Sequence, residues 1–129
     1  MPHYSIAECA ELLATVFPPW VNDLGIRVEH SEANRVVLRL PAAKAIERVG
    51  GIVCGQALMA FADTAMIVAT VSHLGEFLPV ATVSQTTNFL SGAGDGDVIA
   101  DVRLTKTGRG LVFAEVDMTC GEPAYPVAR

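Results

Sequence analysis

The chain has 129 residues, which is enough for one domain with a buried core and too few for two domains of ordinary size. Hydrophobic residues make up 51% of it and charged residues only 18%, so we expect part of its surface to be buried against other copies of the chain. The formal net charge of −5 argues against nucleic-acid binding, which needs a basic surface to neutralise phosphates.

Targeting and metal-binding patterns are not found in the sequence. The N-terminal stretch lacks the basic start and continuous apolar run of a secretory signal. The longest apolar run, Ala57 to Val71, is shorter than a bilayer requires and contains Asp63, so we expect no membrane association and a cytoplasmic location. Cys9, Cys54 and Cys120 are far apart, and the histidines are equally scattered, which argues against a disulfide framework, a metal site or a cofactor.

The first expected element is a helix over residues 5–17, which a Pro-Pro pair ends. Ser5 and Glu8 have the spacing of a capping box, and apolar residues follow at helical intervals. Residues 24–30 and 35–40 are predicted to be two strands that flank the polar turn SEAN, as in a β-hairpin.

A long central helix is predicted from about Cys54 to His73, with Gly75 as its C-terminal stop. Because this helix is apolar on nearly all sides, we expect it to be enclosed. Four candidate strands follow it, over residues 79–90, 97–105, 111–120 and 124–129. Their glycine-rich connectors favour antiparallel neighbours, so the expected fold class is α+β, with one long helix wrapped by an antiparallel sheet. The last strand runs to Arg129, and the sequence leaves open whether a natural chain continues beyond it.

A single carboxylate, Asp63, lies within the apolar central helix. Such a group can simply meet solvent or accept hydrogen bonds from a neighbouring segment. It can also be a partly desolvated carboxylate that activates water or attacks an electrophile. Gly50, Gly51 and Gly55 favour the second interpretation, because free backbone N–H groups at a helix start can stabilise an oxyanion.

The spacing of these groups predicts a dimer. Asp63 lies eight residues after Gly55, or roughly 12 Å along one helix at about 1.5 Å per residue, so one protomer cannot present both groups to one carbonyl. Two copies can do so if their central helices run antiparallel across a two-fold axis. We therefore expect an obligate homodimer with two shared active sites.

Three stretches closely resemble a known family: GQALMAFADTA (55–65), TVSQTTNFL (82–90) and GDGDVIADVRLTKTGRGLVFAEVDM (94–118). The family is the hotdog-fold acyl-CoA thioesterases of the phenylacetic acid degradation type, which are related to 4-hydroxybenzoyl-CoA thioesterases. The resemblance covers about residues 20–129. It implies a single hotdog domain, hydrolysis of an acyl-CoA thioester to the free acid and CoA, and a dimer or a dimer of dimers.

The resemblance also implies catalytic roles. Asp63 is expected to be the nucleophile or general base, the Gly55 N–H the oxyanion donor, and Thr82 a residue that holds the attacking water. Cys54 stands where the family usually has a histidine, and Arg48 where it commonly has an asparagine. We expect Cys54 to be a small buried hydrophobe rather than a second nucleophile. These departures favour the alternative of a non-catalytic acyl-CoA or acyl-ligand binding module. Hydration of an enoyl-CoA would need an Asp and His pair, for which no histidine is obviously placed.

Substrate contacts are expected on either side of the catalytic positions. The residues expected near the acyl group are Cys54, Gln56, Met59, Val83, Ser84 and Phe89. The residues expected near the coenzyme A phosphates are Lys106, Gly108 and Arg109, although simple solvation also accounts for two cations at a hairpin tip. By contrast, Asp95 and Asp97 in the preceding loop would repel phosphate.

Overall fold

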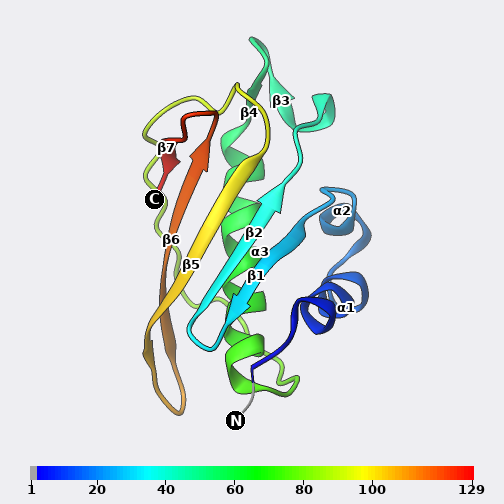
Figure 1. Ribbon diagram of the computed structural model, residues 1–129, viewed down its shortest axis with the longest axis vertical. Coiled ribbons are helices and arrows are strands. Elements are labelled where there is room, and N and C mark those ends of the chain that lie inside the picture. Colours follow the sequence, from blue (N-terminus) through cyan, green and yellow to red (C-terminus); the bar gives the residue numbers. More distant parts are fainter. Residues whose placement is uncertain (1–2) are drawn as a thin grey trace.

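The long helix α3 lies against one face of an antiparallel sheet in the computed structural model, which describes residues 3–129 (Figure 1). The helices are α1 (Ile6–Val16), α2 (Pro19–Asn22), a 3-10 turn (Lys44–Ile46) and α3 (Gly55–Leu74). The strands are β1 (Arg27–Glu32), β2 (Arg35–Leu40), β3 (Glu47–Arg48), β4 (Ile52–Val53), β5 (Val98–Thr107), β6 (Val112–Cys120) and β7 (Tyr125–Ala128). The main sheet has the order β1-β2-β5-β6-β7, and β3 and β4 form a separate hairpin.

The core lies between α3 and the inner face of this sheet. Alternation along β2 and β5 places Leu38 opposite Ala100 and Leu40 opposite Val98, and all four side chains are buried. The outer face carries charges instead, such as the Arg35 guanidinium that donates two hydrogen bonds of 3.0 Å to one carboxylate.

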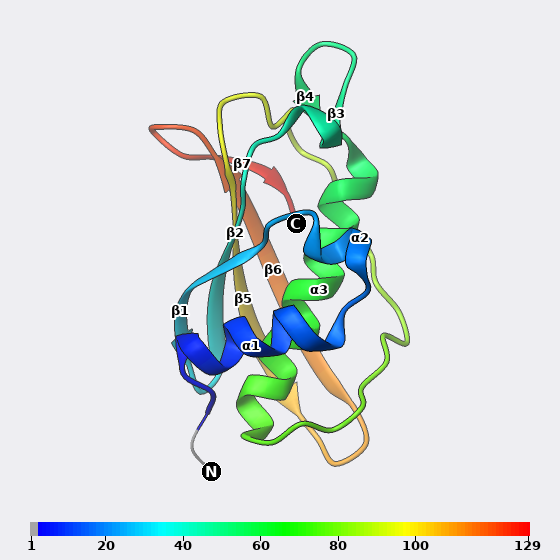
Figure 2. The same ribbon diagram turned by 90° about the vertical axis from the view of Figure 1, so that its right-hand side faces the viewer.

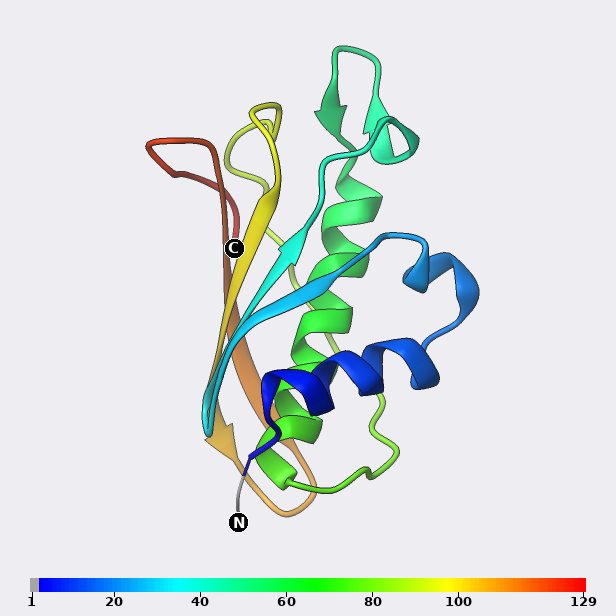
Figure 3. The ribbon, with the colours of Figure 1, turned by 45° about the vertical axis from the view of Figure 1, so that its right-hand side comes forward.

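Helix α1 begins at the predicted capping box. The Ser5 hydroxyl accepts a hydrogen bond from the Glu8 N–H at 3.1 Å, and the Glu8 carboxylate accepts one from the Ser5 N–H at 3.0 Å. Its buried side chains, Cys9, Leu12 and Leu13, pack into the core where α1 crosses α3 (Figure 3). This helix therefore covers one end of the open side of the sheet.

The predicted bounds of helix α3 agree with the structure to within one residue at each end. Cys54 is its N-cap, and Gly75 ends it in the left-handed conformation (φ 73°). Enclosure is confirmed only on the sheet-facing side, where ten residues are buried. Seven of the side chains that stay wholly or partly accessible fall at helical spacing, and we call these seven the open stripe: Gln56, Met59, Ala60, Asp63, Met66, Ile67 and Thr70.

The length and hydropathy of α3 bear on whether this helix could span a membrane. Its 20 residues and its mean hydropathy of 1.5 would suffice to cross a bilayer by length and composition. The helix is longer than the apolar run Ala57–Val71, so length alone no longer argues against a membrane span. More than half of its apolar window, 56%, is buried within the protein, which is typical of a core helix.

The predicted strand over residues 79–90 is wrong for most of its length. Only Phe89 forms a bridge, and its partner is Ala128 of β7 rather than a residue of β5. Strand formation needs a hydrogen-bonded neighbour as well as a favourable composition. Residues 79–87 form no backbone hydrogen bond with the rest of the described chain.

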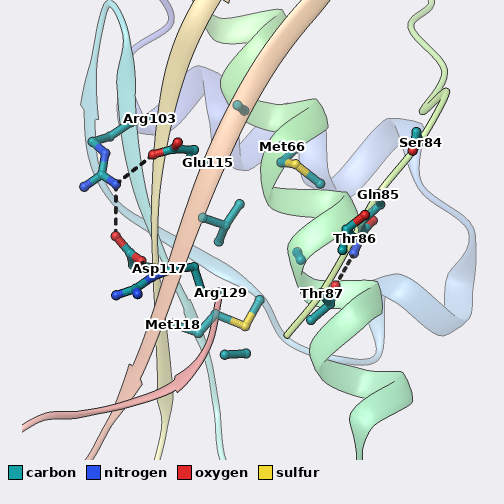
Figure 4. A pocket seen from close by; sticks show the side chains of 14 residues that line it. Met66, Ser84, Gln85, Thr86, Thr87, Arg103, Glu115, Asp117, Met118 and Arg129 are labelled. Carbon is teal, nitrogen blue, oxygen red and sulfur yellow. Dashed lines mark hydrogen bonds and ion pairs between the residues drawn. The ribbon is translucent and has the colours of Figure 1, made fainter. Parts of the chain in front are cut away.

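A cavity of about 480 Å³ has Ala128 and Arg129 in its wall (Figure 4). Its walls include the consecutive residues 114–118 of β6 and the consecutive residues 84–87. Neighbouring residues of a strand point to opposite faces, so a cavity that touches all of them lies at the strand edge, in the plane of the sheet. The cavity therefore separates the segment that follows α3 from β6.

Candidate active site

Asp63 lies on the open stripe and is half-buried. Its Oδ1 accepts a hydrogen bond from the Thr82 hydroxyl, on the segment that runs back along α3 after the helix ends (Figure 2). Within the described residues, Oδ2 accepts no hydrogen bond and the carboxylate has no cationic partner. One carboxylate oxygen is thus held in place while the other is available to a water molecule or a substrate.

The start of α3 offers backbone donors. Cys54 is extended (φ −69°, ψ 152°), and its side chain makes no cap hydrogen bond. No group in residues 3–129 accepts a hydrogen bond from the Gly55 N–H, which therefore remains available at the positive end of the helix dipole. A Cβ at Gly55 would lie 3.3 Å from the Phe89 ring, so this aromatic side chain forms a wall beside the donor.

The expected acyl contacts form a band along α3. Gln56 and Met59 belong to the open stripe, and Phe89 covers the helix start. Val83 follows Thr82 and is 82% exposed in the single protomer. The remaining two residues, Cys54 at the N-cap and Ser84 in the cavity wall, complete the set.

The expected coenzyme A contacts lie elsewhere. Lys106, Gly108 and Arg109 belong to the hairpin between β5 and β6, whose tip lies at the opposite end of the molecule from the start of α3 (Figure 1). Gly108 closes this turn by donating a hydrogen bond of 2.9 Å to the Leu111 carbonyl. One protomer therefore does not bring these cations to its own Gly55.

Arg48, at the second departure from the family pattern, lies in β3 just before α3. Its side chain is exposed, and its guanidinium donates a hydrogen bond of 3.2 Å to the Val49 carbonyl. No ion pair joins it to a carboxylate in the part of the chain that the structure describes.

The two acids expected to repel phosphate have structural partners. Asp97 accepts hydrogen bonds from the Ala42 N–H at 2.8 Å and from the Arg39 guanidinium at 3.1 Å. These bonds, the Ala42 N–H first among them, lower the pKa of Asp97. The Tyr125 hydroxyl donates to the Asp95 carboxylate at 2.8 Å, which raises the pKa of Tyr125 to about 12.

Gln85 is a site residue that the sequence patterns did not indicate. Its side-chain amide donates to the Met59 carbonyl at 3.2 Å and to the Thr87 hydroxyl at 3.3 Å. No sequence signal marks this residue, because an extended segment without a ladder has no fixed alternation. In the described residues, no three His, Cys, Asp or Glu side chains gather closely enough to hold a metal ion.

Comparison with known proteins gives the family. A family model described as the thioesterase superfamily matches residues 50–127, and because this is more than half of the chain, the chain belongs to the thioesterase superfamily. The chain is also 26% identical, over 97 residues, to Ta0293 of Thermoplasma acidophilum, a protein named as an esterase. That alignment covers 75% of this chain and 73% of its relative. The protein is therefore a thioester hydrolase by class.

Solved structures share the fold. Thioesterase HI1161 from Haemophilus influenzae superposes with a TM-score of 0.85 at 19% identity, over 99% of this chain and 89% of that one. Zebrafish thioesterase superfamily member 2 gives a TM-score of 0.85 at 19% identity, over 97% and 93% of the two chains. Together with the family match, these superpositions confirm the hotdog fold.

Proposed function

We propose that this protein hydrolyses acyl-CoA thioesters to the free acid and coenzyme A, in a homodimer whose two active sites are shared between protomers. The hydrogen bond from Thr82 to Asp63 on the open stripe carries the proposal, because it holds a carboxylate where a substrate or a second copy can reach it. The resemblance to thioesterases of the phenylacetic acid degradation type supports the choice of an acyl-CoA substrate.

The chemistry needs few groups, because a thioester is already reactive. With Oδ1 held by Thr82, the Asp63 carboxylate takes a proton from water, whose oxygen attacks the thioester carbon. In a second route the carboxylate attacks the thioester carbon directly and forms a mixed anhydride, which water then hydrolyses to release the free acid and restore Asp63. In either route the C–S bond breaks, the thiolate of coenzyme A leaves, and a backbone N–H stabilises the developing oxyanion.

The dimer supplies that N–H from the partner subunit. The open stripe of α3 is largely apolar, and the segment beside it exposes further large apolar side chains: Phe77, Leu78, Val80 and Val83. An apolar surface of this kind favours burial against a second copy. If the two α3 helices pack antiparallel, Asp63 of each copy faces the Gly55 end of the other.

The same antiparallel packing would bring the cations expected to bind coenzyme A close to the active site. The β5–β6 hairpin lies beside the C-terminal end of α3 (Figure 1). In an antiparallel pair this end lies toward the start of the second α3, so Lys106 and Arg109 of one copy approach the site completed by the other. Two cations at that place suit the phosphates of coenzyme A.

A binding module without catalysis is the second candidate function. The observation that favours it is Cys54, which stands at the expected histidine position and makes no hydrogen bond with its side chain at the helix start. Without an imidazole to orient the carbonyl, the pocket could hold an acyl-CoA and leave it intact.

The test is release of free thiol from a panel of acyl-CoAs. We expect the unmodified protein to hydrolyse at least one of them, and Asp63→Asn to lower kcat by about 100-fold or more because it removes the base. The matched control is Asp23→Asn, which removes an exposed carboxylate outside the site. Equal rates for Asp63→Asn and the unmodified protein would refute the mechanism, and calorimetric binding without thiol release would support the binding module.

A further inference from the structure

Thr82 lies on a segment that lacks backbone hydrogen bonds to its neighbours in the described structure. From residue 76 to residue 87 no backbone hydrogen bond joins this segment to the rest of the described chain. Backbone pairing resumes at Asn88, whose N–H and carbonyl exchange hydrogen bonds of 2.8 and 2.9 Å with Arg129. The hydroxyl that bonds Asp63 therefore lies six residues before the first backbone attachment.

The main sheet does not hold this segment either. The cavity of about 480 Å³ lies between residues 84–87 and β6, and these residues form no ladder with a described strand (Figure 4). Within one protomer, hydrogen bonds from side chains join the segment to α3. Two are found, one from Thr82 to Asp63 and one from Gln85 to the Met59 carbonyl.

Gln85 is well placed to fix this region of the chain. The Met59 carbonyl that accepts its amide at 3.2 Å is also the carbonyl to which the Asp63 N–H bonds in a regular α-helix. Gln85 therefore attaches to α3 one helical turn before Asp63, while its second amide hydrogen reaches the Thr87 hydroxyl at 3.3 Å. Both hydrogens of the amide are used, so its orientation is defined.

We propose that Gln85 is a positioning residue, which ties the segment after α3 to the Met59 carbonyl and thereby places the Thr82 hydroxyl on the Asp63 carboxylate. This inference rests on the proposed function, in which Thr82 holds the general base or nucleophile. Gln85 acts only through Thr82. Small displacements of such groups lower catalytic rates because the reacting atoms leave their productive geometry.

The test is a double-mutant cycle on acyl-CoA hydrolysis with Gln85→Leu and Thr82→Val. Gln85→Leu alone should lower kcat by about tenfold and leave KM within about twofold, since the geometry of the base is affected rather than substrate binding. In the Thr82→Val background, Gln85→Leu should have no further effect. The matched control is Thr86→Ala, an exposed residue in the same segment whose side chain makes no hydrogen bond in the described structure.

A general structural role gives a different result. If Gln85 served only stability, its replacement would lower kcat equally with and without the Thr82 hydroxyl, and that outcome would overturn the proposal. An unchanged kcat in Gln85→Leu would overturn it as well.

A second readout separates this inference from the proposed function. Nuclear Overhauser contacts between the Thr82 methyl group and α3 should be present in the unmodified protein and in Thr86→Ala, and lost in Gln85→Leu. If the unmodified protein hydrolyses no acyl-CoA, the proposed function fails while these contacts still decide whether Gln85 positions Thr82. Contacts that persist in Gln85→Leu would contradict the positioning role.

Discussion

The Cys54 side chain occupies the N-cap of α3 without capping it. Serine is among the best N-cap residues, because its hydroxyl accepts a hydrogen bond from an N–H of the first turn. We therefore expect Cys54→Ser to raise the free energy of unfolding by about 1 kcal/mol, measured by urea denaturation. Thioester hydrolysis should persist, since the proposed mechanism assigns no bond-forming step to the thiol.

Cys54→Ala provides the matched control, because it removes the thiol without adding a capping group. It should keep hydrolysis and gain none of the stability. Loss of hydrolysis in both variants would identify the thiol as a nucleophile and contradict the role given to Asp63.

At the residue scale, the sequence predicted those site residues whose side-chain type already suggests a chemical role. A carboxylate in an apolar helix drew attention to Asp63, and the resemblance pointed to Thr82, which the structure places on that carboxylate. Their catalytic roles stay predictions. Gln85 could not be predicted, because its partner is a backbone carbonyl and only the course of the chain brings the two together. Asp97 was predicted to repel phosphate, but the chain fold gives it partners on other elements.

The carboxylate of Asp97 links the end of β2 to the start of β5. Asp97 precedes β5 and accepts hydrogen bonds from the Ala42 N–H, just after β2, and from Arg39 on β2. Its pKa is lowered, so the carboxylate stabilises the folded state above pH ~4 and loses that effect as the pH falls through its folded-state value.

We expect Asp97→Asn to lower the free energy of unfolding by roughly 1 kcal/mol at pH 7, a modest value because the side chain is partly exposed. Urea denaturation at pH 7 and pH 3 measures the effect, and the difference from the unmodified protein should shrink at the lower pH. Asp23→Asn is the control. A difference that stays constant or grows on acidification would contradict the assigned hydrogen bonds.

At the element scale, local patterns predicted α1, the β1–β2 hairpin and α3, but not the short helix α2 or the β3–β4 hairpin. The capping box fixed α1, and Gly75 ended α3 at the expected place. The segment 79–90 was predicted as a strand because its composition favours one, yet strand formation also needs a neighbour. Among the described residues of this segment, only Phe89 bridges to a neighbour, Ala128 of β7, and the segment's own sequence does not specify that pairing.

At the scale of the whole molecule, Asp63 and Gly55 lie on the same helix and one protomer cannot bring them together. The open stripe offers a second copy an apolar face with the carboxylate in it. A shared site is therefore the central claim, and it requires variants that remove each group without disturbing the fold.

Gly55→Pro is suited to removing the oxyanion donor. Proline lacks the N–H, and it is tolerated at the first position of a helix, which Gly55 occupies. The preceding Cys54 is already extended (φ −69°, ψ 152°), as a residue before proline must be. Gly55→Ala is the matched control, since it adds a Cβ beside Phe89 and keeps the N–H.

The most direct measurement is the hydrolysis rate of a mixed dimer, purified through two different tags, that contains one Asp63→Asn chain and one Gly55→Pro chain. Each variant alone should be inactive as a homodimer. In the mixed dimer one site combines the intact Asp63 of one chain with the intact Gly55 of the other, so the rate should return to about half that of the unmodified dimer. A mixed dimer as inactive as its two parents would contradict the account, because it would mean that no site pairs these groups across the two chains.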